Sequence, residues 1–226
     1  GLDSAPADAR AAAAALDVSV LHVVEALLGG PASYLEEILP AQSARLGADR
    51  IGLIIPREEQ ENLPGHDAFR STYFSSRRPR LLNVLRLMVA IRTRLRREPV
   101  DVIHAQGTFA GVAVRLAVRG MARRPKSVYC AHGWACGRRT QAWKNRVAAG
   151  VERLLAGWAD SIVCISTHEY DAARRIGIPP ERLFRIISGI HDLPPGPAAR
   201  SAADPQPVWP TGTRRFAFVG RFDQQK

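Results

Sequence analysis

Two histidines lie at the ends of apolar runs of the kind that form buried strands. His132 follows the run 127–131 and precedes Gly133, and His104 ends the run 100–104. Ligands collect at the carboxyl ends of strands in open parallel sheets, and imidazole exchanges protons near neutral pH. We therefore predict that His132 faces a ligand crevice as a catalytic residue. His104 is either a second crevice residue or a buried histidine that supports the site.

Two adjacent glycines, Gly29 and Gly30, follow the first apolar run, 18–24. Pro31 comes next, where the first turn of a helix is expected and where its missing N–H costs little. Backbone N–H groups and a helix N-terminus can bind an anion at such a turn. The spacing departs from the GxGxxG pattern of dinucleotide-binding proteins. The residues predict either an anion site or a plain tight turn.

The segment 214–226 holds a short apolar run followed by a glycine and two cations. Residues 216–219 predict a strand, and Gly220, Arg221 and Lys226 come after it. A glycine lets a ligand approach the backbone, and cations neutralise phosphate charge, so we predict a phosphate site here. Because such a strand commonly opens an α/β domain, we expect the chain to be the first half of a two-domain enzyme, cut where the second half begins.

Signatures of several other enzyme classes are absent from the sequence. There is no DxD motif or carboxylate pair to hold a divalent cation, which argues against metal-dependent chemistry. There is no GxSxG nucleophile elbow and no GKS or GKT phosphate loop. Cys130, Cys136 and Cys164 show neither disulfide nor zinc spacing, so we expect reduced thiols and a cytoplasmic protein.

The elements that position these residues alternate along the chain. Apolar runs predict strands at 18–24, 50–55, 100–104, 127–131, 161–165 and 183–187. Helices are expected after Gly30 and at 81–97, 109–121, 141–158 and 169–176. This alternation is typical of an α/β fold with a doubly wound, Rossmann-like parallel sheet. His22 lies in the middle of the first strand and is expected in the core.

The domain boundaries follow from composition. We expect a disordered N-terminus at 1–16, the Rossmann-like domain at 17–190, a proline-rich linker at 191–212 and the first strand of a second domain at 213–226.

The chain is strongly basic. Its 32 arginines and lysines against 21 acidic residues give a formal net charge of +11. This excess is either a solvated basic surface or an attraction to an anionic membrane, a phosphorylated substrate or nucleic acid. The helix over 80–97 carries six arginines beside apolar positions, so it is either a surface helix packed on the sheet or a cationic face for anionic lipid. Basic clusters interleaved with aromatic residues are absent, which counts against nucleic acid.

The chain from residue 18 onward resembles the retaining glycosyltransferases of family 4, which have the GT-B fold and include many enzymes of bacterial surface-polysaccharide synthesis. The matching segments occur in the family's order: Leu21-His22-Val23 with Gly29-Gly30, Asp101-Val102-Ile103-His104-Ala105, Ala131-His132-Gly133-Trp134, Glu152-Arg153 with Ala159-Asp160, Ile165-Ser166 with Glu169, Ile187-Ser188-Gly189-Ile190, and Val219-Gly220-Arg221 through Lys226.

The resemblance implies roles for particular residues. His132 matches the cleft histidine near the transferred sugar and acceptor, with Gly29, Gly30, His104 and Gly133 on the acceptor side of the cleft. Gly220, Arg221 and Lys226 match the site that holds the donor pyrophosphate and stabilises the departing phosphate.

The sequence departs from the family pattern at three places. Gln106 stands where many relatives have a second histidine, and Ser188 replaces the asparagine of an Asn-Gly turn. The paired glutamates of the second domain, expected about 80 residues beyond Lys226, are absent from the chain.

The implied reaction is retaining, metal-independent transfer of a hexosyl group from a nucleotide sugar to a saccharide or lipid-linked acceptor. The nucleotide sugar is the substrate and no cofactor is expected. The acceptor is expected to meet loops within 57–80, at the inner face of the plasma membrane. Two alternatives stay open: a truncated, non-catalytic domain that is inert or serves as an interaction module, and, from the charge alone, a nucleic-acid-binding protein.

Overall fold

The computed structural model describes residues 17–76, 80–137 and 141–189. The described residues belong to one compact unit. The predictions for the N-terminal 16 residues, for the linker and for the strand with Gly220, Arg221 and Lys226 lie outside the described residues, as does Ile190.

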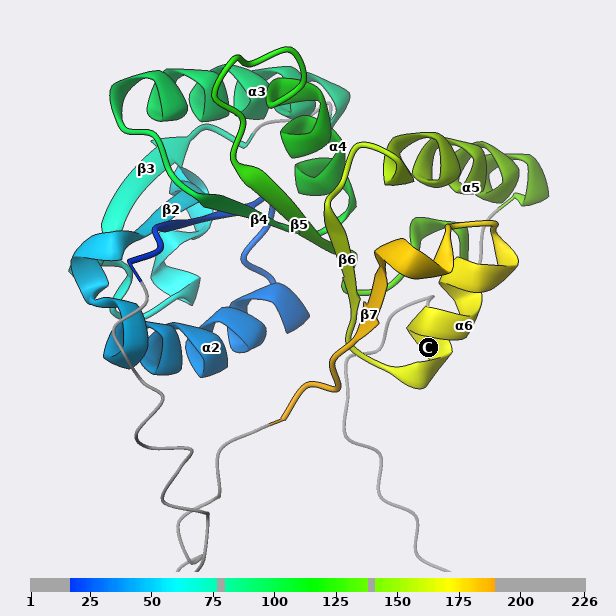
Figure 1. The fold of residues 1–226 in the computed structure, drawn as a ribbon, viewed down its shortest axis with the longest axis horizontal. Helices are drawn as coiled ribbons and strands as arrows, with labels where there is room; N and C mark the ends of the chain where they lie inside the picture. Colours follow the sequence, from blue (N-terminus) through cyan, green and yellow to red (C-terminus); the bar gives the residue numbers. More distant parts are fainter. Residues whose placement is uncertain (1–16, 77–79, 138–140, 190–226) are drawn as a thin grey trace, which may run out of the picture. The chain divides into compact units, whose positions relative to one another are not determined.

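A seven-stranded parallel sheet runs through the described part of the chain, with strand order β3-β2-β1-β4-β5-β6-β7 (Figure 1). Its strands are β1 Val20–Val24, β2 Ile51–Pro56, β3 Arg70–Phe74, β4 Val102–Gln106, β5 Lys126–Cys130, β6 Ser161–Cys164 and β7 Leu183–Arg185. The chain first builds the sheet from β1 towards β3, then returns past β1 and continues from β4 to β7. This confirms the predicted doubly wound α/β fold.

Helices cover both faces of this sheet. They are α2 Gly30–Leu46, α3 Arg80–Arg97, α4 Thr108–Ala117, α5 Ala142–Ala156 and α6 Thr167–Arg175. Residues of α3, α4, α5 and α6 share one buried apolar cluster with the sheet, whereas α2 packs into a separate cluster with β1 and β2 on the other face. None of the described helices combines the length and apolar character that crossing a bilayer requires.

Local sequence explains where several elements begin. Gly29 has φ +69° before α2, and Pro31 stands in the first turn, as the sequence predicted. Ser166 caps α6: its hydroxyl accepts a hydrogen bond from the backbone N–H of Glu169 at 3.1 Å. The Glu169 carboxylate in turn accepts from the N–H of Ile165 at 3.0 Å, so the end of β6 and the start of α6 are fixed together.

Two aspartates tie neighbouring strands together at the amino edge of the sheet. Asp101, before β4, accepts hydrogen bonds from the backbone N–H and hydroxyl of Ser19, before β1, at 2.8 and 2.7 Å. Asp160, before β6, accepts from the same groups of Ser127 at 2.8 and 3.0 Å. These hydrogen bonds lower the pKa of both carboxyl groups.

All six strands predicted between residues 18 and 187 are present, but this part of the sheet also contains a seventh strand, β3, which was not predicted. The region 57–80 was expected to be loops, and it instead contains two short 3-10 helices and the edge strand β3. From Arg70 to Tyr73 the side chains of β3 are exposed or partly exposed, and Phe74 is buried. An edge strand has no continuous apolar run, so the pattern used for the other strands misses it.

Candidate active site

The candidate site lies where the strand order reverses, between the carboxyl ends of β1 and β4. Val24, the last residue of β1, pairs with Gln106, the last residue of β4. The next strand, β5, ends at Cys130, two residues before His132, and its carbonyl accepts a hydrogen bond from Gly107 N–H at 2.9 Å. Ligands of doubly wound sheets bind at such a reversal, so these strand ends define the candidate crevice.

The backbone at His132 is unusual. With φ +51°, it is the single non-glycine residue in the left-handed region among the residues that the structure describes, and Gly133 follows at φ +101°. A non-glycine residue there costs on the order of 1 kcal/mol or more, and such conformations cluster at functional sites. The turn directs the imidazole of His132 back towards β4.

Gln106 joins the two predicted histidines. Its side-chain oxygen lies 2.5 Å from Nε2 of His132, and its side-chain nitrogen lies 3.2 Å from Nδ1 of His104. Gln106 is fully buried and His104 is 8% exposed. Because an amide oxygen only accepts, the proton of His132 lies on Nε2, and its Nδ1 is left as an acceptor.

Tyr34 of helix α2 also borders the site. It lies near the start of α2, four residues after Gly30. Its ring meets the His132 ring edge to face with centroids 4.9 Å apart, and the His104 ring at 6.3 Å. The N-terminal part of α2 therefore packs against the histidine.

Gly29 and Gly30 are not equivalent in this turn. Gly29 has a positive φ, whereas Gly30 lies in α2 and a Cβ built on it meets nothing within 4 Å. Open space at a helix N-terminus is compatible with the approach of an anion. Whether an anion binds there stays a prediction.

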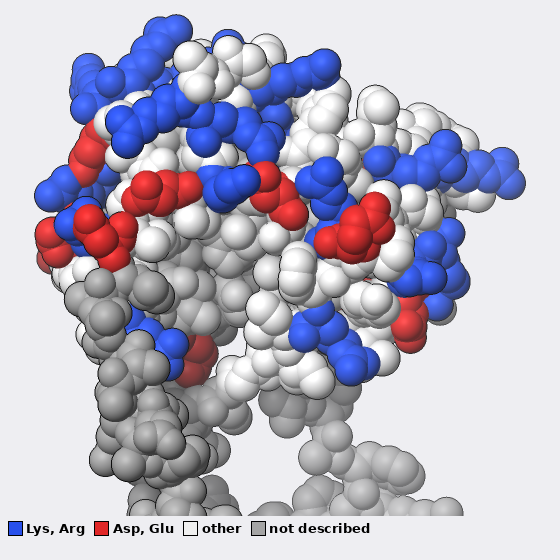
Figure 2. All heavy atoms as spheres, viewed as in Figure 1, with Lys and Arg blue, Asp and Glu red and all other residues white. Residues whose placement is uncertain are grey.

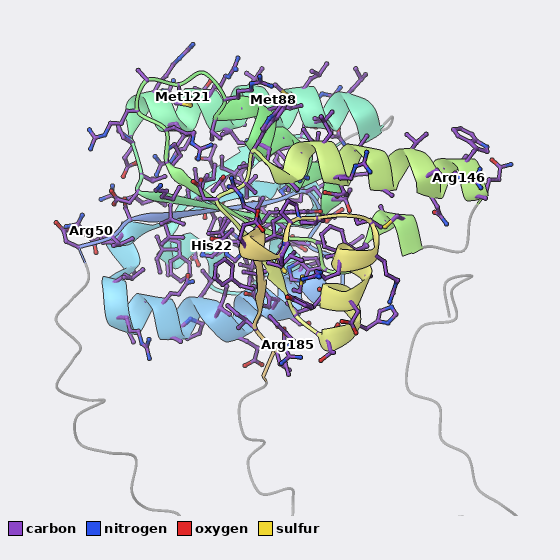
Figure 3. The ribbon with its side chains drawn as sticks, turned by 45° about the vertical axis from the view of Figure 1, so that its right-hand side comes forward. His22, Arg50, Met88, Met121, Arg146 and Arg185 are labelled. Atoms are coloured by element: carbon purple, nitrogen blue, oxygen red, sulfur yellow. The ribbon has the colours of Figure 1, made fainter. Side chains whose placement is uncertain are left out.

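His22 is a buried residue that contacts the site through His104. It is fully buried on β1 beside His104, with ring centroids 5.3 Å apart, and Figure 3 shows it in the interior of the domain. Its Nε2 forms a 2.7 Å hydrogen bond with the side-chain oxygen of Gln42 on α2. The prediction that His22 is a core residue is confirmed.

Burial sets the protonation state of these rings. It lowers the pKa of His22 and of His132 to about 4. Burial also holds the pKa of His104 well below its ordinary value, and electrostatic repulsion from His22 and His132 lowers it further. Burial also raises the pKa of Tyr34 to about 12, with a smaller contribution from Cys130. All four rings are thus neutral at pH 7 and can take part in the site as uncharged hydrogen-bonding groups.

Trp134 fixes the segment that carries His132. Its indole nitrogen donates a 2.9 Å hydrogen bond to the carbonyl of Glu169 on α6, and its ring meets that of Tyr129 edge to face at 6.1 Å. Glu25 lies just beyond β1, and its carboxylate accepts a hydrogen bond from the N–H of Ala110 at 2.6 Å. This contact ties the end of β1 to the start of α4. The strand-end turns are therefore held from both sides.

A buried ion pair lies behind the site. Arg115 of α4 and Glu152 of α5 are each 1% exposed, with 2.9 Å between Nη2 and Oε2. Tyr129 donates to the other oxygen of Glu152 at 2.8 Å, and the guanidinium lies 4.3 Å from the centre of the Tyr129 ring. Glu152 is thus a packing residue that joins α4, α5 and β5.

The structure brings together part of the predicted site and adds residues to it. His132, His104, Gly133 and the Gly29–Gly30 turn converge at one sheet edge, whereas Gly220, Arg221 and Lys226 lie outside the described residues. Sequence reasoning missed Tyr34 and the bridging role of Gln106. Gln106 was noticed only as a departure from the family pattern; the aromatic residue four positions after Gly30 was the available signal for Tyr34.

Two further observations bear on the chemistry of the described residues. Cys130, Cys136 and Cys164 are free thiols, and burial raises the pKa of Cys130 to about 12 and of Cys164 to about 11. Within 17–76, 80–137 and 141–189, no three or more His, Cys, Asp or Glu side chains are arranged to hold a metal ion.

Solved structures with the same fold include HepE and WaaB. The Anabaena protein HepE (Alr3699), crystallised with UDP-glucose, is 19% identical with a TM-score of 0.59, over 76% of this chain and 44% of that one. The lipopolysaccharide outer core galactosyltransferase WaaB is 11% identical with a TM-score of 0.56, over 76% of this chain and 46% of that one. The described domain is thus the N-terminal, Rossmann-like domain of a GT-B fold.

Sequence comparison gives the family. An uncharacterized 41.2 kDa protein in the cps region of Klebsiella pneumoniae is 24% identical over 212 residues, which are 92% of this chain and 57% of that protein. The chain thus spans little more than half the length of this relative. The profile of Glycosyltransferase Family 4 matches residues 28–192, most of the described domain. The chain belongs to glycosyltransferase family 4.

Proposed function

We propose that this domain binds the acceptor in the transfer of a hexosyl group from a nucleotide sugar to a saccharide or lipid-linked acceptor, in polysaccharide or glycolipid synthesis. The observation that carries the proposal is the position of His132: a strained backbone at the switch point of a family 4 domain, with its ring held by Gln106. Membership of family 4 supports the reaction class.

The protonation state of His132 suggests how it acts. With Nε2–H donated to Gln106, the lone pair of Nδ1 is left to accept a hydrogen bond from an acceptor hydroxyl. A neutral imidazole with a pKa of about 4 is a weak base at pH 7. We therefore assign to His132 the orientation of the reacting hydroxyl, with proton transfer coupled to departure of the donor phosphate.

The donor side of the proposal rests on the sequence. Gly220, Arg221 and Lys226 would hold the pyrophosphate, and their charges would offset the negative charge that develops on the leaving group without a metal ion. HepE was crystallised with UDP and with UDP-glucose, which supports a uridine nucleotide sugar as the donor. We further propose retention of configuration, no cofactor besides the nucleotide-sugar substrate and a cytoplasmic location, with α3 as the surface for an anionic membrane.

Acceptor binding can be tested on the 226-residue chain. We expect simple glycosides to shift the amide resonances of Gly107 and Gly133, at two adjacent strand ends, in ¹H–¹⁵N spectra. His132→Ala should weaken this binding, and His168→Ala, an exposed histidine at the start of α6, should not. If a panel of pyranosides and lipid-linked sugars leaves the resonances of Gly107 and Gly133 unmoved, the acceptor assignment is wrong.

Transfer is measured separately, on a protein in which the expected second domain follows this one, by mass spectrometry of glycosides incubated with UDP-glucose and other nucleotide sugars. A positional role predicts that His132→Ala lowers the rate about a hundredfold, and EDTA should leave it unchanged. The anomeric coupling constant of the product reports retention or inversion. Acceptor binding without nucleotide-sugar binding or transfer would instead support the alternative of a non-catalytic domain.

A further inference from the structure

A basic pocket lies at the opposite edge of the sheet from His132. It has a volume of about 440 Å³ and is bounded by the C-terminal half of α3 and the connection from α4 to β5. Arg92, Arg96, Arg119 and Arg123 line it, over apolar surface from Leu95 and Met121. Figure 3 shows Met121 on the same outer layer as Met88 of α3.

Positive charge in this pocket is held in place and is not neutralised locally. No carboxylate is among the described residues that line it. Arg92 donates from Nε to the carbonyl of Ala117 at 3.1 Å, and the guanidinium of Arg119 lies 3.9 Å from the centre of the Trp158 ring. Guanidinium groups fixed in this way bind phosphate oxygens through paired N–H donors.

The nearby acidic groups are occupied elsewhere. Glu98 forms an ion pair with Arg94 at 2.8 Å. Asp101 accepts hydrogen bonds from Ser19, although Arg123 contributes a little to lowering its pKa. The pocket therefore attracts an anion that the described protein residues do not supply.

An exposed apolar stripe leads along α3 to the pocket. Leu82, Leu85 and Val89 are 44%, 57% and 66% exposed. Their spacing of three and four residues continues to Arg92 and Arg96, so all five lie along one side of the helix. An apolar stripe that ends in phosphate-binding arginines has the two chemical features of an anionic lipid surface, namely acyl chains next to phosphate.

The region that contains α3, α4 and α5 is strongly basic, as binding to an anionic lipid surface requires. Residues 80–158, which include α3, α4 and α5, hold sixteen arginines and lysines and three acidic residues. The excess positive charge of the chain is thus concentrated here, and Figure 2 shows basic side chains gathered over α3. Such an excess would make two copies of this face repel each other.

We propose that the four-arginine pocket binds the phosphate of an anionic phospholipid while Leu82, Leu85 and Val89 enter the bilayer interface. Nucleic acid would use the arginines but would gain nothing from the exposed leucines and valine. The inference specifies the membrane contact of the proposed function, but it rests on the pocket and the stripe and holds even if transfer is never observed.

The test is co-sedimentation of the full chain with vesicles of phosphatidylcholine alone and of phosphatidylcholine with 40% phosphatidylglycerol. We expect binding to the anionic vesicles only. Arg96→Glu/Arg123→Glu should weaken it by at least about tenfold. Arg174→Glu/Arg175→Glu, the same charge change at two exposed arginines of α6, should change it less than twofold.

A second pair of variants tests the apolar stripe. Leu85→Ser/Val89→Ser should also lose vesicle binding, whereas Val147→Ser/Leu154→Ser, which removes exposed apolar groups from α5, should retain it. Thermal unfolding verifies that each variant is folded. Transfer to a soluble glycoside should be the same in Arg96→Glu/Arg123→Glu as in the parent, so failure of lipid binding and failure of the proposed activity are distinguishable.

Several results would overturn the inference. If Arg96→Glu/Arg123→Glu and Arg174→Glu/Arg175→Glu weakened vesicle binding equally, net charge alone would drive the binding. Displacement from vesicles by millimolar inorganic phosphate, with no effect of the serine variants, would indicate a free phosphate as the ligand. Binding of a short DNA duplex through the same arginines, without binding to vesicles, would indicate nucleic acid.

Discussion

The side-chain oxygen of Gln106 accepts a hydrogen bond from Nε2 of His132 at 2.5 Å, and this contact joins the ends of β4 and β5. It fixes the tautomer of a histidine whose backbone is already strained. The orientation of the imidazole is therefore set by a neighbouring strand as well as by its own turn.

Replacing Gln106 tests this relationship. Gln106→Leu leaves the Nε2–H of His132 and the ring of His104 without their amide partner, so we expect the free energy of unfolding to fall by about 1–3 kcal/mol. Glycoside binding should weaken as well, because the ring is no longer held. Urea unfolding and titration of Gly133 resonances measure the two effects. Gln141→Leu, an exposed position before α5, should alter neither.

The buried histidines predict how stability depends on pH. The pKa of His22 is about 4 in the folded protein and near 6.5 when unfolded. Above pH 6.5 both states are neutral; below it the unfolded chain takes up a proton that the folded chain does not. The free energy of unfolding should therefore fall as the pH drops from 6.5 towards 4, by about 2–3 kcal/mol for this group at pH 4.5.

Urea unfolding at pH 7.5 and 4.5 measures this loss. His22→Gln should show a smaller loss than the parent, with the remainder contributed by His104 and His132. His168→Gln, at an exposed position, should reproduce the parent curve. A loss of stability in His22→Gln that matched the parent would show that His22 titrates normally in the folded protein.

The buried pair of Arg115 and Glu152 should be sensitive to the loss of either partner. Glu152→Gln leaves a buried guanidinium without its counter-charge, and we expect a loss of about 3–5 kcal/mol in the free energy of unfolding. Asp17→Asn, which breaks the exposed pair with Arg50, should cost less than about 1 kcal/mol. A double-mutant cycle with Arg115→Met then gives the coupling energy. A coupling near zero would contradict the pairing.

Two helical glycines should respond in opposite ways to alanine. A Cβ at Gly111 of α4 would lie 2.3 Å from a ring carbon of Tyr129, so Gly111→Ala should destabilise by at least about 1–3 kcal/mol. At Gly150 of α5 a Cβ meets nothing within 4 Å, and Gly150→Ala should stabilise by about 0.5–1 kcal/mol. Thermal melts of the two variants measure both changes in stability. A stable Gly111→Ala protein would imply that the Tyr129 ring moves aside.

The fold could be predicted from sequence because its signals are local. Buried parallel strands such as β1 and β2 are continuous apolar runs, and Gly29 with Pro31 marks the start of a helix within a few residues. The edge strand β3 has no such run, because most of its side chains remain in contact with solvent. The prediction of His132 as a site residue is local in the same way, because it rests on the residues that stand next to it in the sequence.

The remainder of the site depends on contacts between distant residues. Gln106 reaches His132 across 26 positions, and Tyr34 contacts it from helix α2. A glutamate in a helix, such as Glu152, usually faces water; its burial follows from Arg115, which lies 37 residues earlier. Nothing in the local sequence specifies these pairings. They follow from strand register and helix packing.

The strand order also has a consequence for how the domain folds. Neighbours within β1–β3 and within β4–β7 are consecutive in the chain, whereas β1 and β4 are joined at ends such as Ser19 and Asp101, 82 residues apart. Closing that long segment costs entropy before the pairing of β1 with β4 compensates for it. We expect each half to organise early and the junction between them to limit the folding rate. The crevice at His132 lies beside this junction, so the reactive surface should be among the last parts of the domain to form.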